Sequence, residues 1–143
     1  MLSNTSKYAI RAMIYLAIGK EDSKTGLRKI ADELDIPGPF LAKILQTLAK
    51  HKLLLSAKGP NGGFTLAKDP HKISLYEIVT VMDGSDMFNK CLISLRTCNE
   101  ENVPCPIHKK YEGIRNEFKE LFQNQNLGDL SNDIKAQEQI YAL

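Results

Sequence analysis

The feature that most constrains the fold of this chain is a pair of short helical patterns separated by a break that contains two prolines. Apolar residues recur at helical spacing in residues 27–34 and again in residues 40–50. Between the two patterns, Pro37 and Gly38 interrupt a helix, and Pro39 lies where the first turn of a new helix tolerates proline. Two short helices joined by about three or four residues are typical of a helix-turn-helix.

A hairpin pattern follows the helix pair. Residues 53–57 and 63–67 are predicted to be short strands, and the Gly-Pro-Asn-Gly sequence of residues 59–62 has the composition of a tight turn. A helix-turn-helix with a hairpin behind it is a winged helix. We therefore expect a mainly α fold with a small β-hairpin wing.

Two further helices are expected around this unit. The first covers residues 5–18, with Thr5 or Ser6 as its N-cap. Another begins at Ser74, because Ser74 and Glu77 have the spacing of a capping box. These helices supply the scaffold on which the helix-turn-helix would pack.

The net charge of +2 conceals an uneven distribution of charge. The first 72 residues hold 12 Lys and Arg against 6 Asp and Glu, whereas residues 73–143 hold 7 against 11. Between Ile36 and Lys68, five lysines occur without any acidic residue. Such a surface is the electrostatic footprint of a polyanion-binding site, and the alternative is a solvated lysine-rich surface.

If the unit binds DNA, the second of the two short helices lies in the major groove. There Phe40 suits a thymine methyl group, Gln46 suits adenine, and Lys43 suits guanine or a phosphate. The candidate DNA-binding residues are Pro39, Phe40, Lys43, Gln46 and Thr47 on the helix, with Lys58, Asn61 and Gly62 in the wing. Plainer roles are open for several: Phe40 in the core, Lys43 and Gln46 in solvent, and Gly62 as turn geometry alone.

All three cysteines are close together and are followed by a histidine. They form the pattern Cys91-x6-Cys98-x6-Cys105-x2-His108. Three thiolates and an imidazole can hold an iron–sulfur cluster or zinc. The alternatives are thiol redox sensing without a metal, inert packing of the cysteines, and a surface position for His108. Because an odd number of cysteines does not suit a secreted disulfide framework, we expect a cytoplasmic protein.

From Pro106 onward, apolar residues form a narrow helical seam. Heptad-like spacings of 4, 3, 4 and 3 separate Ile107, Tyr111, Ile114, Phe118 and Leu121. The seam predicts self-association into a homodimer, and the alternative is packing on its own domain. A break at Gly128 and Asp129 and a short helix over residues 130–143 are expected to follow.

The expected organisation has three parts, and the absence of certain sequence patterns argues against several classes of protein. Residues 1–84 form the DNA-binding domain, residues 85–105 the sensor loop, and residues 106–143 the dimerisation helix and C-terminal extension. No apolar run approaches the roughly 18–20 residues that span a bilayer, so no membrane partner is expected. The chain has no Cys-x-x-Cys and no nucleotide-binding glycine pattern after a strand, so we do not expect an enzyme, and a small thiol redox enzyme is the least favoured function.

The wing and helix motifs resemble the Rrf2 family of bacterial transcriptional regulators. The resemblance covers residues 5–122 and is carried by the motifs Tyr8-Ala9, Leu27-x-x-Ile30-Ala31-x-x-Leu34, Phe40-Leu41-x-Lys43-Ile44-Leu45 and Lys58-Gly59-Pro60-Asn61-Gly62-Gly63-Phe64-x-Leu66-Ala67. It implies a dimeric winged-helix regulator whose long C-terminal helix crosses its partner, and DNA contacts at Phe40, Lys43 and Lys58. Pro37 and Pro39 depart from the small hydroxyl residues common in the family, which puts phosphate contacts there in doubt.

The resemblance also bears on the cysteines. Cluster-binding members of the family carry a similar three-cysteine loop, in some followed by a histidine, so it implies an iron–sulfur cluster, with the 2Fe–2S type preferred to 4Fe–4S. The expected function is therefore a sequence-specific repressor that binds a palindromic operator in double-stranded DNA. It would sense redox, nitric oxide or iron–sulfur status through Cys91, Cys98 and Cys105. The alternative is a regulator without a cluster, controlled by thiol oxidation, a small ligand or a protein partner.

Overall fold

The computed structural model of the chain describes residues 2–20, 22–93 and 105–136. These residues form six α-helices, two short 3-10 helices (η) and one antiparallel hairpin, which confirms the mainly α winged helix. The elements in chain order are α1 (Asn4–Ile18), α2 (Leu27–Leu34), α3 (Gly38–Lys50), β1 (Leu54–Ala57), β2 (Gly63–Leu66), η1 (Pro70–Lys72), α4 (Leu75–Asp83), η2 (Ser85–Phe88), α5 (His108–Asn124) and α6 (Leu127–Ala136).

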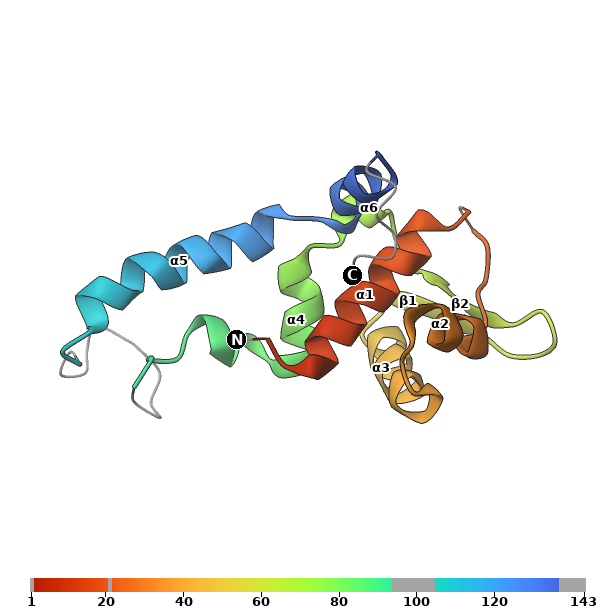
Figure 1. The fold of residues 1–143 in the computed structure, drawn as a ribbon, viewed down its shortest axis with the longest axis horizontal. Helices are drawn as coiled ribbons and strands as arrows, with labels where there is room; N and C mark the ends of the chain where they lie inside the picture. The colour runs from red at the N-terminus through yellow and green to blue at the C-terminus, as the bar shows by residue number, and fades with distance from the viewer. Residues whose placement is uncertain (1, 21, 94–104, 137–143) are drawn as a thin grey trace.

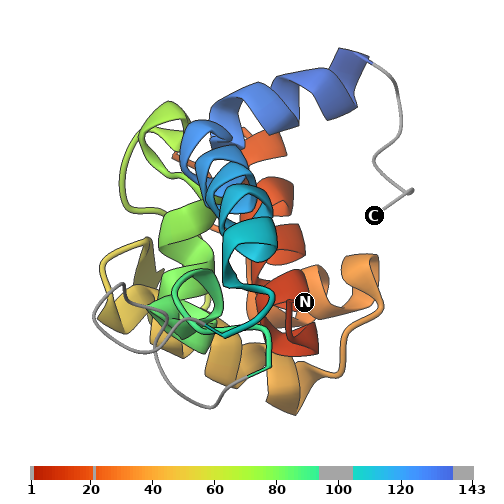
Figure 2. The same cartoon turned by 90° about the vertical axis from the view of Figure 1, so that its left-hand side faces the viewer.

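The first helix, α1, is the central support of the molecule. It contacts α4 on one side and α2, α3 and strand β2 of the hairpin on the other (Figure 1). The long helix α5 projects from this body as an arm, and α6 returns across α1 (Figures 1 and 2). Among the described helices, none combines the length and the apolar character needed to cross a membrane.

The core forms around the apolar stripe of α1. Ala9 and Ala12 are completely buried, and their small side chains let the neighbouring helices approach α1 closely. The same core is filled from the other elements by Ile30, Leu41, Leu45, Leu48, Leu53, Leu54, Ile73, Ile78 and Leu127. The DNA-binding unit and α6 therefore share one continuous core.

The N-cap of α1 is Ser3, so the prediction of Thr5 or Ser6 is wrong. The Ser3 hydroxyl accepts the Ser6 N–H at 3.0 Å and donates to the Asp83 carboxylate at 2.5 Å. Burial of Asp83 opposes ionisation, but hydrogen bonds led by the one from Ser3 outweigh it and hold the pKa of Asp83 below its usual value. The cap lies at Ser3 because this residue also ties α1 to the end of α4.

The predicted cap of α4 is confirmed on the Ser74 side. The Ser74 hydroxyl accepts the Glu77 N–H at 3.1 Å. The Glu77 carboxylate accepts a hydrogen bond from Lys68 at 2.8 Å. Lys68 is therefore paired within the fold, and the expected basic surface loses one of its five lysines to Glu77.

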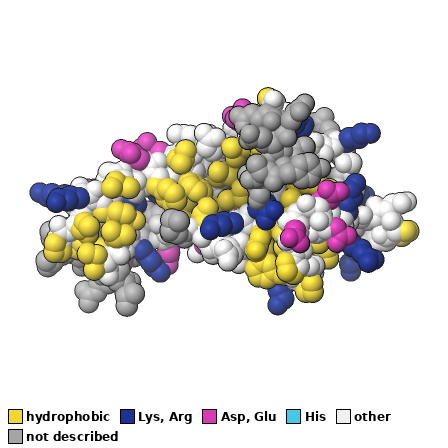
Figure 3. Space-filling model, in the orientation of Figure 1, with side chains coloured by type: hydrophobic (Ala, Val, Ile, Leu, Met, Phe, Trp, Pro, Cys, Tyr) yellow, Lys and Arg dark blue, Asp and Glu magenta, His cyan; other side chains and the backbone are white. Residues whose placement is uncertain are grey.

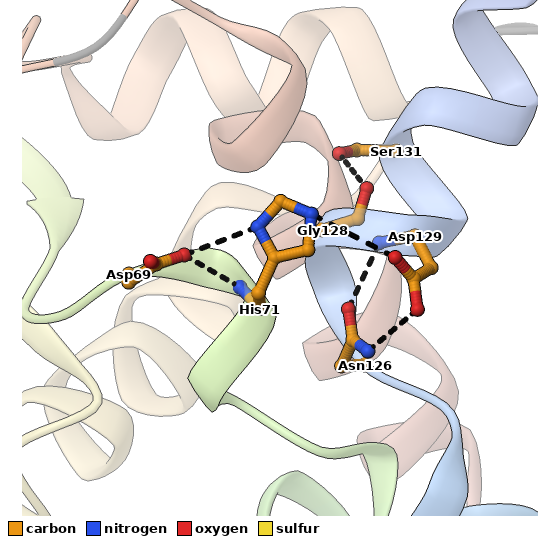
Figure 4. A network of polar contacts seen from close by, with 6 residues as sticks. All are labelled: Asp69, His71, Asn126, Gly128, Asp129 and Ser131. Carbon is orange, nitrogen blue, oxygen red and sulfur yellow. Dashed lines mark hydrogen bonds and ion pairs between the residues drawn. The ribbon is translucent and has the colours of Figure 1, made fainter.

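Helix α6 begins earlier than expected, so the predicted break at Gly128 and Asp129 is wrong. The Asn126 side chain accepts the Asp129 N–H at 2.9 Å and donates to the Asp129 carboxylate at 2.7 Å (Figure 4). This pair caps the helix at Asn126 and leaves Gly128 in its first turn. A side chain at Gly128 would overlap the ring of His71 in its present position, so glycine allows the ring to pack closely on α6.

His71 joins the end of the hairpin segment to α6. Its Nδ1 lies 3.2 Å from Asp69, and its Nε2 lies 3.7 Å from Asp129 (Figure 4). The His71 backbone N–H donates to Asp69 and, with the side-chain contact, lowers the pKa of that exposed carboxyl group. The sequence pattern carried no indication of the contact between His71 and Asp129, because these residues are more than fifty positions apart.

Candidate nucleic-acid interface and sensor segment

Helix α3 begins two residues before the start indicated by its apolar pattern. Pro37 is the N-cap, and its carbonyl accepts the N–H groups of Phe40 at 3.1 Å and Leu41 at 2.9 Å. Pro39 occupies the first turn, where the missing N–H costs no helical hydrogen bond. The two prolines thus define the tight entry into α3.

One face of α3 is buried and the opposite face is open to solvent. The buried residues are Leu41, Ile44, Leu45 and Leu48. Among the predicted contacts, Pro39, Phe40, Lys43 and Gln46 are exposed. Thr47 is half-buried, and its hydroxyl donates to the Lys43 carbonyl at 2.8 Å. The exposed predicted contacts of α3 therefore include one cation, one amide and one aromatic ring.

Phe40 lies neither wholly in the core nor wholly in solvent. Its side chain is 39% exposed. Its ring meets the ring of Tyr8 on α1 in a T-shaped contact, with centroids 5.7 Å apart and planes at 84°. One part of the Phe40 ring is thus held by the scaffold while another part remains accessible.

The wing carries the other predicted contacts in the turn between β1 and β2. Lys58 and Asn61 are exposed there. The Gly62 N–H donates to the Gly59 carbonyl at 2.9 Å, and a side chain at Gly62 would overlap the Ala57 carbonyl. Turn geometry alone therefore accounts for glycine at position 62.

A backbone connection between the wing and Thr25 was not foreseen from the sequence. Thr25 and Phe64 exchange two hydrogen bonds, N–H to O at 2.9 Å and 2.8 Å, as an antiparallel bridge. Gly63 precedes the bridge with φ of 145°, and a side chain there would lie 2.6 Å from the Thr25 carbonyl. The bridge attaches the hairpin to the segment that leads into α2, so the wing and the helix-turn-helix are held as one unit.

The sensor segment is described only at its two ends. Cys91 and Cys105 are half-buried, whereas Cys98 lies outside the described residues. The His108 N–H donates to the Cys105 carbonyl at 2.9 Å, and the His108 Nε2 lies 3.8 Å from Glu112. Within the described part of the chain, no three His, Cys, Asp or Glu side chains form a metal-binding group.

The predicted seam of α5 divides between two environments. Phe118 packs against Phe88 and Phe122 in a second apolar cluster, with ring centroids 5.8 Å and 4.7 Å away. Ile114 and Leu121 remain 64% and 53% exposed. Hydrophobic side chains are accordingly visible along the arm in Figure 3. Packing of α5 on its own domain thus uses only part of the seam.

Sequence relatives of the chain are transcriptional regulators. The profile of the Rrf2 family, described as an iron-dependent transcriptional regulator, matches residues 2–133. A protein of Aquifex aeolicus named as an HTH-type transcriptional regulator is 35% identical over 133 residues, or 92% of each chain. The HTH-type transcriptional regulator IscR of Photobacterium profundum is 27% identical over 137 residues, which cover 96% of this chain and 78% of IscR.

Solved structures agree with these relatives. CymR of B. subtilis, described as the global cysteine regulator, has a TM-score of 0.76 and 26% identity, covering 92% of this chain and 96% of CymR. IscR of T. potens has a TM-score of 0.75 and 25% identity, covering 96% of this chain and 90% of that one. The profile match extends from α1 into α6 rather than over the helix-turn-helix alone, and the match to CymR covers 92% of the chain. The chain therefore belongs to the Rrf2 family of transcriptional regulators.

Proposed function

We propose that this protein is a homodimeric, sequence-specific repressor that binds a palindromic DNA operator under the control of its cysteine segment. The observation that carries the proposal is the open face of α3, which presents Phe40, Lys43 and Gln46 beside a wing that carries Lys58. No acidic residue occurs between Ile36 and Lys68 to oppose a phosphate backbone. Action on an operator requires the cytoplasm, where bacterial DNA lies.

In this proposal α3 reads the major groove and the wing contacts the backbone. Lys43 binds guanine or a phosphate, Gln46 binds adenine, and the exposed part of Phe40 meets a thymine methyl group. Lys58 and Asn61 meet phosphate or the minor groove at the wing. Three further residues contribute through their shape. Pro39 sets the entry of α3, the Thr47 hydroxyl is fixed by its bond to Lys43, and Gly62 allows the tight turn of the wing.

The second copy of the chain is proposed to cover the exposed residues of α5. Ile114 and Leu121 are seven positions apart and therefore lie on one face of the helix. Large apolar side chains more than half exposed are typical of an interface with a partner. A two-fold dimer places two α3 helices about one helical turn of DNA apart, which predicts a palindromic operator.

The donor set of the sensor segment fits an iron–sulfur cluster. Cys91, Cys98, Cys105 and His108 would hold it as three thiolates and one imidazole, which are ligands that iron accepts. A backbone hydrogen bond from the His108 N–H to the Cys105 carbonyl fixes the turn that carries the last two of these residues. When bound, the cluster would supply a redox-sensitive centre whose oxidation or loss changes the charge of the segment.

Control of DNA binding requires that the state of the segment change the position of the DNA-binding units. In the chain, Phe88 lies near the start of this segment and α5 follows its end, and Phe118 and Phe122 of α5 pack on Phe88. Movement at this aromatic cluster would shift α5 relative to α4, which itself contacts α1. A change in the segment could therefore alter the spacing of the two α3 helices.

DNA binding is tested by selecting an operator from random duplexes and measuring affinity at several salt concentrations. We expect a palindromic site and a steep loss of affinity with salt. The salt slope is the slope of the logarithm of the affinity against the logarithm of the salt concentration. Lys43→Ala and Lys58→Ala should each reduce the size of this slope by about 1 where the lysine meets a phosphate. Lys110→Ala on α5 is the matched control and should leave the slope unchanged. Binding that is indifferent to sequence would contradict the proposal.

The cluster is tested by purifying the protein without oxygen and recording its visible absorption and iron content. We expect a coloured protein that contains iron, and Cys91→Ser should lose both colour and iron. Ser85→Ala, close in sequence but without a ligand atom of this kind, is the control. A colourless, iron-free wild type would reject the cluster and favour control by thiol oxidation, a small ligand or a protein partner.

A further inference from the structure

We propose that Tyr8, on the scaffold helix α1, is a positioning residue for base recognition by Phe40. The inference rests on the proposed function, because it concerns how α3 reads DNA. In it, the T-shaped contact of the Tyr8 ring holds the Phe40 ring in the orientation that reaches a thymine methyl group. Tyr8 itself needs no contact with DNA.

Phe40 requires an external support because of its place in α3. It is the third residue of the helix, which begins at Gly38. Side chains deeper in a helix have their rotamers restricted by the preceding turn, whereas Phe40 has no complete turn before it. With 39% of its surface exposed, it is not held by the core on all sides either. The contact with Tyr8 at a centroid distance of 5.7 Å supplies the missing restraint.

Tyr8 is in turn held by Arg11, one helical turn further along α1. The guanidinium carbon of Arg11 lies 5.9 Å from the centroid of the Tyr8 ring, a cation–π distance. The same guanidinium donates to the carbonyl of Leu34 at 2.9 Å. Because Leu34 is the last residue of α2, Arg11 and Tyr8 together connect α1 to both helices of the helix-turn-helix.

The experiment removes single methyl groups from the selected operator by replacing each thymine in turn with uracil. Wild type should show one thymine in each half-site whose replacement weakens binding about fourfold, the value of one buried methyl group. We call this difference in affinity between the thymine and uracil operators the methyl step, and Phe40→Ala should lose it. Tyr8→Leu should also lose it, while its affinity for the uracil operator stays within about twofold of wild type.

Two tyrosine variants serve as controls. Tyr8→Phe keeps the aromatic ring and should keep the methyl step. Tyr15→Leu removes a half-buried tyrosine seven residues along the same helix and should also keep it. Thermal unfolding of every variant reports whether it folds, and Tyr8→Met replaces Tyr8→Leu if the latter does not. The salt slope should stay the same throughout, because no phosphate contact changes.

The outcomes separate this inference from the proposed function. Sequence-specific binding with a methyl step that Phe40→Ala abolishes but Tyr8→Leu retains would overturn the positioning role and leave the function standing. An equal weakening of both operators by Tyr8→Leu would mean a structural role only and would also overturn it. A wild type with no thymine-dependent step rejects the Phe40 contact, and a wild type that selects no sequence rejects both proposals.

Discussion

Gly63→Ala should strongly destabilise the protein, because it removes the connection between the wing and Thr25. The new Cβ would lie 2.6 Å from the carbonyl carbon and oxygen of Thr25, which are backbone atoms that cannot swing aside. The φ of 145° also strains any residue with a side chain, at a cost of about 1–2 kcal/mol. Loss of the two Thr25–Phe64 hydrogen bonds adds about 1 kcal/mol each. The expected total is about 3–4 kcal/mol, a large part of the roughly 5–15 kcal/mol typical of a domain.

Urea unfolding followed by circular dichroism, at a fixed protein concentration, measures this loss. Gly59→Ala is the matched control in the same turn. Its φ of 100° carries similar strain, but no atom lies within 4 Å of the new Cβ, so it should cost only about 1–2 kcal/mol. If the two variants lost equal stability, the Thr25 bridge would contribute nothing and the reasoning would be refuted.

Three other predictions follow from contacts outside the wing. Asp83→Asn should destabilise the protein by about 1–2 kcal/mol at pH 7, because ionised Asp83 accepts from Ser3. Since its pKa is lowered in the fold, this difference should be present above pH 3.8 and fade as the pH falls through the folded value, as urea unfolding at pH 7 and pH 3 would reveal. Ile114→Glu combined with Leu121→Glu should give a folded monomer in sedimentation analysis, and a surviving dimer would reject the α5 interface. Gly128→Ala should lower the melting temperature slightly by displacing His71, and adding His71→Ala should recover the loss; failure to recover it would contradict the packing argument.

Much of the local structure followed from nearest-neighbour patterns. The apolar spacing of α2 and α3, the prolines between them and the glycine-rich wing turn predicted the winged helix, and the structure confirms it. Ser74 was recognised as a cap because its partner, the Glu77 N–H, lies three residues away. Such features depend on residues within about one helical turn, which a linear pattern displays directly.

Predictions from local sequence were wrong where a contact between residues distant in the chain decides the structure. Thr5 and Ser6 were reasonable caps for α1, but Ser3 is used because it also bonds Asp83, eighty positions along the chain. The poor helix propensity of glycine predicts a break at Gly128, yet the residue lies inside α6, where the absence of a side chain lets the His71 ring pack closely. In each case a long-range contact outweighs an intrinsic preference of less than about 1 kcal/mol.

The features of the candidate site also fall into those that local sequence predicts and those that only tertiary contacts determine. The order of residues by itself indicates Lys43 and Gln46 on α3, Lys58 in the wing and the spacing of the cysteines. Each of these features depends only on residue type and local geometry. The pairing of Tyr8 with Phe40, the bridge from Thr25 to the hairpin and the neutralisation of Lys68 by Glu77 cannot be read in this way. They arise when distant segments close around α1, where packing of the whole chain sets which side chains meet.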